Sequence, residues 1–297
     1  MELAICPQTL GGLVGGDGGT EAIMTFCAGY GVKTFDFGIR SRPGTCLTYA
    51  DDWMDRAKRF ADNTSALGYR FCQSHAPYSR FLYESIEYYR EMTRRAIEIA
   101  AILGAPCVVI HPELRDFRSQ DYDHDAAFAR AKEFYLPFAE LASRLGVKLA
   151  VENLFDFKRR WNYGATVEEQ IEFIEALGGS DTVGACWDFG HAHVMYGDED
   201  SEKLRQLGSR VICTHVHDNS QAKDLHLPPY LGEIDWDRQM KALADTGYRG
   251  ELDLEIKVAK LPPELKTDYL DFIFRGGKRL TEIFESYINK SNKEETI

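Results

Sequence analysis

Short apolar runs alternate with longer amphipathic stretches along this chain, and the pair of patterns recurs eight times. A short apolar run bounded by turn residues is typical of a buried strand, whereas apolar positions three and four residues apart indicate a helix. The predicted strands are Leu3–Pro7, Thr34–Ile39, Arg70–His75, Cys107–His111, Lys148–Leu154, Val183–Asp188, Arg210–Val216 and Glu251–Ile256. The predicted helices are Glu21–Tyr30, Asp52–Leu67, Glu84–Leu103, Asp125–Leu145, Val167–Leu177, Glu202–Leu207, Asp237–Thr246 and Leu265–Ile288.

Glycine supports these boundaries, because the residue after a helix often needs a positive φ angle. Seven predicted helices end at such a residue: Gly31, Gly68, Gly104, Gly146, Gly178, Gly208 and Gly247. Regular strand–helix–strand alternation implies right-handed crossovers between parallel strands. Eight such units in 297 residues favour closure into a (β/α)8 TIM barrel over an open sheet. We therefore predict one TIM-barrel domain that comprises residues 1–297.

Composition narrows the classes of function. The chain has 35 basic and 47 acidic residues, a net charge of −12, which argues against general nucleic-acid binding and suits a protein that holds divalent cations. Its seven cysteines show no CxxC spacing, so a reducing compartment is expected. The start of the chain lacks the features of a signal peptide, and no apolar stretch is long enough to span a membrane. We expect a soluble cytoplasmic protein.

Metal-binding residue types gather where the predicted strands end. Six consecutive strands, the third to the eighth, each carry one near the carboxyl end: His75, His111, Glu152, Asp188, His215 and Glu255. Active sites of TIM barrels form at that end of the strands. Their ordered placement predicts a shared site.

The alternation of side chains along a strand gives a second indication. Successive side chains point to opposite faces. If Leu254 and its apolar neighbours in the eighth strand face the helices, Glu255 points into the barrel, and the same reasoning turns Glu152 inward in the fifth strand. In the seventh strand, His215 and His217 both lie on the inner side.

A lone histidine at a strand end is more often a packed or surface residue than a ligand, and a lone carboxylate is more often a helix cap. Inward carboxylates, however, carry a large desolvation penalty unless a cation offsets it. The set Glu152, Asp188, His215 and Glu255 offers three carboxylates and one imidazole. Such an oxygen-rich set suits Mn²⁺ best, with Mg²⁺, Co²⁺ or Zn²⁺ as alternatives. Glu152 and Glu255, from opposite sides of the barrel, would move a proton next to a metal-bound carbonyl.

Three further stretches point to a known family. They are Asp188–His191 (DFGH), His215–Asn219 (HVHDN), and Asp224–Pro229 (DLHLPP) with Gly232–Trp236 (GEIDW). Together with the strand-end residues, they resemble the xylose-isomerase-like superfamily of sugar isomerases and epimerases, which also contains the endonuclease IV type of DNA-repair enzyme. The resemblance covers most of the chain and is strongest from His75 to Glu255.

The resemblance implies roles for individual residues. In the ketose-epimerase branch, Glu152, Asp188, His215 and Glu255 would hold the metal, the two glutamates would be the acid/base pair, and His191 would contact substrate oxygens. The endonuclease branch uses additional metal ligands, and this chain has a candidate at each matching position: His75, His111, His191, Asp224 and His226. His217 would replace His215 as a ligand or bind substrate.

The leading hypothesis is therefore a metal-dependent isomerase or epimerase of a sugar or sugar phosphate. The alternatives are a multi-zinc phosphodiester hydrolase, to which the basic residues Arg40, Arg42 and Lys158–Arg160 could contribute, and a metal-dependent lyase or C-deglycosidase acting on a sugar conjugate. The expected partner is a small sugar-like molecule rather than nucleic acid or membrane. Tyr88, Tyr89 and the long final helix are candidates for a homo-oligomer interface.

Overall fold

The structure is a computed structural model that describes residues 1–10, 19–39, 50–77, 85–114, 122–156, 161–221, 223–258 and 261–294. The chain divides into two compact units. Unit 1 comprises Met1–Phe35 and Trp187–Ile297, and unit 2 comprises Asp36–Cys186. Strands β2 (Thr34–Gly38) and β6 (Val183–Asp188) contain the two boundaries, so each strand contributes residues to both units.

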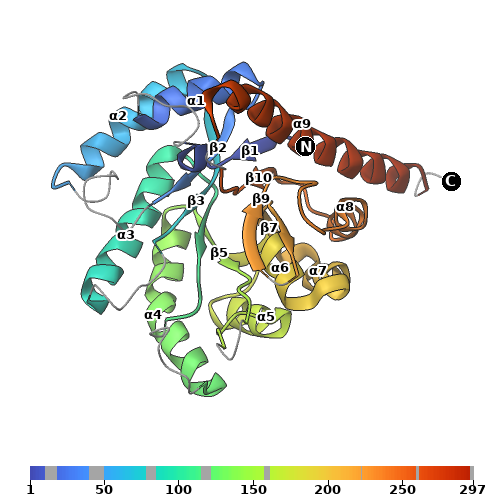
Figure 1. The fold of residues 1–297 in the computed structure, drawn as a ribbon. Helices are drawn as coiled ribbons and strands as arrows, with labels where there is room; N and C mark the ends of the chain where they lie inside the picture. The colour runs from blue at the N-terminus through green and yellow to red at the C-terminus, as the bar shows by residue number, and fades with distance from the viewer. Residues whose placement is uncertain are drawn as a thin grey trace. The chain divides into compact units, whose positions relative to one another are not determined.

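The described part of unit 2 contains three complete strands and four helices. The strands are β3 (Arg70–His75), β4 (Cys107–Ile110) and β5 (Lys148–Glu152), and the helices are α2 (Trp53–Ala66), α3 (Ile86–Leu103), α4 (His124–Arg144) and α5 (Val167–Ala176). The strands are parallel, and β5 pairs in turn with β6, where Glu152 lies opposite Cys186. The helices pack side by side in chain order and cover these strands (Figure 1).

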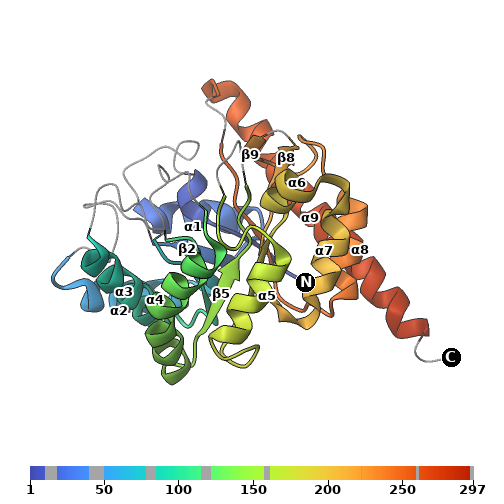
Figure 2. The same ribbon diagram turned by 90° about the horizontal axis from the view of Figure 1, so that it is seen from below.

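Unit 1 contains the remaining elements of the sheet. Its strands are β1 (Leu3–Ile5), β7 (Val211–His215) and β10 (Leu252–Leu254), with a hairpin of β8 (Asp218–Ser220) and β9 (Lys223–Leu227). Its helices are α1 (Gly19–Gly29), α6 (Phe189–Tyr196), α7 (Asp200–Leu207), α8 (Trp236–Asp245) and α9 (Pro263–Glu294), with short 3₁₀ turns at Pro7–Leu10, Gly197–Glu199 and Gly208–Arg210. In Figure 1, α9 runs beside α8, and Figure 2 shows the hairpin next to α6.

The eight main strands form one sheet in the order β10-β1-β2-β3-β4-β5-β6-β7. A parallel bridge between Val216 and Leu254 links the end of β7 to β10, and the Val216 N–H donates to the Asp253 carbonyl at 2.7 Å. The fold is therefore a TIM barrel, as the periodicity predicted. Each of the eight predicted strands overlaps an observed one.

The predicted orientation of the eighth strand is also confirmed. A β-carbon placed on Gly277 of α9 would lie 3.1 Å from Leu254 Cδ1, so Leu254 faces this helix. Side chains alternate along the strand, and Asp253 accordingly lies on the other face, fully buried.

Helix α6 and the β8–β9 hairpin were not predicted from the sequence. Helix α6 begins at Phe189, directly after β6, because the Asp188 side chain caps it by accepting a hydrogen bond from the His191 N–H at 2.6 Å. The β8–β9 hairpin lies in a stretch for which no strand was predicted. Its strands have three and five residues with mixed polarity, too short and irregular for a period-two pattern to emerge.

The cysteines that the structure describes lie in the interior. Cys6, Cys27, Cys72, Cys107, Cys186 and Cys213 are all buried. Among the described helices, none is both long enough and apolar enough to cross a membrane.

Candidate metal and active site

In unit 2, three of the predicted residues lie together at the carboxyl ends of their strands. The Nε2 atoms of His75 and His111 lie 3.1 Å and 2.7 Å from the same Glu152 oxygen, Oε2. The two imidazole rings meet edge to face, with their centroids 5.0 Å apart. Glu152 is almost fully buried, with 1% of its side chain exposed. Two imidazole nitrogens thus converge on one buried carboxylate oxygen.

The hydrogen bonds of His75 indicate that a proton or a cation lies between its Nε2 atom and the Glu152 oxygen. Its Nδ1 lies 2.6 Å from the Ala76 carbonyl oxygen, which can only accept, so Nδ1 carries the hydrogen. In the neutral ring, Nε2 then presents a lone pair to the Glu152 oxygen. Two lone pairs at this distance repel unless a proton or a cation lies between them. A histidine that donates from one ring nitrogen to a backbone carbonyl and turns the other towards a carboxylate is typical of a metal ligand.

In unit 1, the three other residues of the predicted ligand set converge. His215 Nδ1 lies 3.8 Å from Asp188 Oδ2 and 3.6 Å from Glu255 Oε2. Asp188 and His215 are fully buried, whereas 27% of the Glu255 side chain is exposed. Two carboxylates beside one buried imidazole place more negative charge than the ring can neutralise. The donor set therefore fits a divalent cation.

Local structure holds Asp188 in place. One carboxylate oxygen caps α6 through the His191 N–H, and the His217 Nε2 atom lies 3.0 Å from the same carboxylate. His217 is fully buried, and its Nδ1 has no hydrogen-bond partner among the described residues. Asp188 is thus positioned by a helix terminus and by an imidazole.

A second group in unit 1 consists of His191, His217, Asp224 and His226, whose ligand atoms all lie within 4.8 Å of one another. The rings of His217 and His226 stack with centroids 4.0 Å apart, and His226 Nε2 lies 3.2 Å from Asp224 Oδ2. His226 Nδ1 lies 2.9 Å from the backbone oxygen of Glu255. His226 therefore repeats the pattern of His75, with Nδ1–H on a carbonyl and Nε2 towards a carboxylate.

The electrostatics of this group favour a positive charge. Burial lowers the pKa of His226. The hydrogen bond to Asp224 and the charge of Glu255 raise it by more than burial lowers it, so the pKa rises from 6.5 to about 9. Burial raises the pKa of Asp224, and the hydrogen bond to His226 outweighs it, so that this pKa lies well below its usual range. Asp224 therefore remains an anion that demands a cationic neighbour, which is either a protonated His226 or a metal ion.

Comparison with known proteins places this architecture in a family. Residues 24–273 match the family described as "Xylose isomerase-like TIM barrel". The chain belongs to this family. The match covers most of the barrel and bears out the resemblance inferred from the sequence motifs.

Three known proteins are similar to this chain in sequence or in fold. The uncharacterized protein y4fM of Sinorhizobium fredii is 36% identical over 170 residues, which are 56% of this chain but only 51% of that protein's length. A structure of L-ribulose 3-epimerase superposes with a TM-score of 0.75 at 16% identity, covering 98% of this chain and 97% of the other. The IOLI protein, solved with a bound zinc atom, has a TM-score of 0.72 at 17% identity, covering 97% and 99%. At such identities the two structures establish the shared fold.

Two residues to which the sequence analysis assigned no role, Asp218 and Asn219, support the candidate site. Asn219 Oδ1 accepts hydrogen bonds from the backbone N–H groups of Leu225 and His226, and His226 adopts a positive φ of 49°. Asp218 is buried and accepts from the indole of Trp236 at 2.9 Å and from the Tyr230 N–H at 2.8 Å. Both residues lie in the His215–Asn219 stretch that resembles the family, but residue type and spacing do not reveal these hydrogen bonds.

Every predicted ligand candidate thus has a described position in one of three groups. Unit 2 holds His75, His111 and Glu152, and unit 1 holds the other two groups. The basic residues Arg40, Arg42 and Lys158–Arg160 lie outside the described residues.

Proposed function

We propose that this protein is a divalent-metal-dependent isomerase or epimerase that acts on a sugar or sugar phosphate. The observation that carries the proposal is the convergence of Asp188 and Glu255 on one imidazole, His215, within 3.8 Å. Glu152, at the carboxyl end of β5, would be the fourth ligand, because the active face of a TIM barrel is built at the carboxyl ends of its strands. Three carboxylates and one imidazole suit Mn²⁺ best.

A divalent ion held by these residues would polarise the substrate oxygens and acidify the adjacent C–H bond. Glu152 and Glu255 would then move the proton, one removing it and the other returning it. Their surroundings differ. Glu152 is 1% exposed and is held by two imidazoles, whereas Glu255 is 27% exposed. We therefore propose that Glu255 exchanges its proton with water, whereas Glu152 transfers a proton in a position shielded from water.

The comparisons support the proposed reaction class to the extent that a related fold is used by L-ribulose 3-epimerase. The stronger support is chemical, because a paired acid and base beside a cation site is what epimerisation next to a carbonyl requires.

The test uses Glu152→Gln and Glu255→Gln with a panel of ketoses and ketose phosphates in D₂O. Product is measured by chromatography, deuterium incorporation by NMR, and bound metal by elemental analysis. Each variant should lose about 10²–10⁴-fold in rate with metal still bound, because an amide ligates through oxygen but transfers no proton. Glu140→Gln, at an exposed position on α4, is the matched control. Full activity in either site variant would refute the acid/base assignment.

A second candidate function is a multi-metal phosphodiester hydrolase. The specific observation in its favour is that His75 and His226 each donate from Nδ1 to a backbone carbonyl and turn Nε2 towards a carboxylate, in groups beyond the Asp188–His215–Glu255 set. Metal analysis combined with incision of an oligonucleotide containing an abasic site tests it. Two or three zinc ions per chain with incision would favour the hydrolase. One ion without incision would exclude it.

A further inference from the structure

A continuous stripe of exposed side chains runs along α9 with the spacing of a helix–helix seam. Leu265, Asp268, Phe272, Arg275, Arg279 and Glu282 are separated alternately by three and four residues, and all six are exposed. Positions with this spacing lie on one face of a helix. Between Leu265 and Glu282 the stripe is about 26 Å long. The opposite face of α9 packs on α8, β1 and β10, so the stripe is the side that the rest of unit 1 leaves uncovered.

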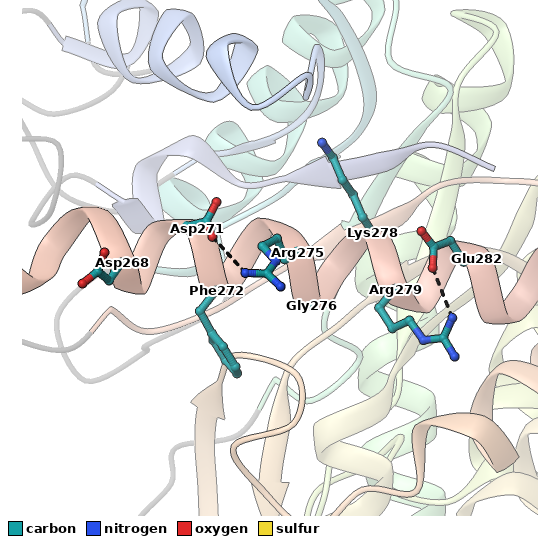
Figure 3. Close-up of a pocket in the computed structure, with 8 residues that line it drawn as sticks. All are labelled: Asp268, Asp271, Phe272, Arg275, Gly276, Lys278, Arg279 and Glu282. Carbon is teal, nitrogen blue, oxygen red and sulfur yellow. Dashed lines mark hydrogen bonds and ion pairs between the residues drawn. The ribbon is translucent and has the colours of Figure 1, made fainter.

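Five of the six stripe residues line a groove, and the stripe carries exposed apolar surface. The groove has a volume of about 810 Å³ and is lined by residues from Asp268 to Glu282, with Phe272 on its side (Figure 3). Within the described part of unit 1, the exposed large hydrophobic residues are Tyr230, Leu231, Leu265 and Phe272. All four belong to α9 or to the loop beside it, because a β-carbon on Gly276 would lie 3.6 Å from Tyr230 Cδ2. Clustered exposed apolar residues mark interaction surfaces more often than scattered ones do.

The charges on the stripe are arranged so that it complements itself. Its first half carries Asp268, its centre Arg275, and its second half Arg279 and Glu282, of which Glu282 lies opposite the uncharged Leu265 in the arrangement described below. Asp268 has no ion pair among the described residues, whereas Arg275 pairs with Asp271 at 3.3 Å and Arg279 with Glu282 at 3.2 Å, both drawn in Figure 3. When two copies of α9 meet antiparallel about a two-fold axis near residues 273 and 274, Asp268 lies opposite Arg279 of the second copy. Phe272 then lies opposite its Arg275, which suits a cation–π contact.

We propose that this face of α9 binds a second copy of the same chain and forms a two-fold symmetric homodimer. In such an interface each contact occurs twice, because the same patch is used by both subunits. The two copies each carry a net charge of −12 and repel at long range, so the local pairing of opposite charges must select the register. The inference does not depend on the reaction catalysed, because the stripe contains none of the proposed ligand or catalytic residues.

Sedimentation velocity of the full chain over a range of concentrations tests the proposal. The wild type should show a monomer–dimer equilibrium that shifts towards the dimer as the protein concentration rises. Asp268→Arg and Arg279→Asp should each raise the Kd about tenfold or more, because each turns two attractive pairs into repulsive ones. The double variant should restore dimerisation. Phe272→Asp should abolish it.

Circular dichroism of every variant separates loss of association from loss of folding. Glu140→Arg, the same kind of charge reversal on the exposed face of α4, should leave the dimer unchanged. A monomeric wild type at all concentrations would overturn the proposal. So would a dimer that persists in both Asp268→Arg and Phe272→Asp, because another surface would then hold it.

Discussion

Gly190 and His217 occupy adjoining space so closely that no side chain fits at position 190. A β-carbon on Gly190 would overlap the His217 imidazole, which lies against the first turn of α6. The same imidazole contacts the Asp188 carboxylate at 3.0 Å and stacks on His226. Packing therefore requires glycine at position 190, because only glycine leaves room for the His217 ring. This ring contacts one residue of each of the two candidate metal-binding groups in unit 1, Asp188 and His226.

Gly190→Ala should displace His217 and destabilise the fold by about 1–3 kcal/mol, because the added methyl group overpacks a fully buried site. Urea unfolding measures the loss. Gly29→Ala, at the end of α1 with no atom within 4 Å of the added carbon, is the matched control and should be neutral or stabilising by up to about 1 kcal/mol. Equal stability of the two variants would contradict the packing role of Gly190.

Asp218→Asn should destabilise the protein by about 3 kcal/mol. Asp218 accepts hydrogen bonds from Asn219 N–H, Tyr230 N–H, Ile234 N–H and the Trp236 indole. In Asp218→Asn, the amide NH₂ would replace one accepting oxygen and leave some of these donors without an acceptor. Thermal unfolding monitored by Trp fluorescence would detect the change. Asp198→Asn, at a position 96% exposed, should change stability by less than about 0.5 kcal/mol. A stable Asp218→Asn protein would show that the network is not needed.

Removal of divalent ions should destabilise the wild type. A bound cation would offset the repulsion between Asp188 and Glu255, so a chelator should lower the Tm by about 3 °C or more, and Mn²⁺ should restore it. Asp188→Asn should bind less metal by elemental analysis. His124→Asn, which changes a half-exposed histidine on α4, should keep the wild-type metal content. A Tm and metal content indifferent to both chelator and Asp188→Asn would exclude a metal at this set.

Glu91 on α3 should stabilise the protein only above acidic pH. Its hydrogen bond to Arg94, opposed by burial and aided by Arg95, lowers its pKa from 4.5 to about 2. A folded-state pKa below the unfolded value gives a stabilisation that is present above pH 4.5 and is lost as the pH falls towards 2. The side chain is 39% exposed, so solvent limits the effect to below about 1 kcal/mol.

Glu91→Gln should therefore lower the free energy of unfolding at neutral pH, and its difference from the wild type should shrink below pH 4.5. Urea unfolding across this range measures the difference. Glu133→Gln, at an exposed position on α4, should show no such pH-dependent difference. A Glu91→Gln deficit that stays constant with pH would mean that the carboxylate charge is not its cause.

Much of the barrel was predictable because its strands and helices follow from short-range patterns of apolar and polar residues. Apolar runs and helical spacing lie within a few residues of one another, and the glycines after the helices, such as Gly104 with φ 71° and Gly146 with φ 72°, have the predicted positive angles. Helix α6 escaped prediction because its eight residues show no clear apolar face, and only the capping contact of Asp188 marks where it begins.

The sequence by itself determined the eight strands, the order of the candidate ligands at the strand ends and the family, since each depends on residue type and local spacing. Only the tertiary structure decided which atoms meet. The Nδ1–H of His226 finds the Glu255 carbonyl 29 residues away, and His75 and His111 share one oxygen of Glu152 across 77 and 41 residues. Such contacts depend on how the strands pair and on side-chain rotamers, and no periodicity along the chain encodes them.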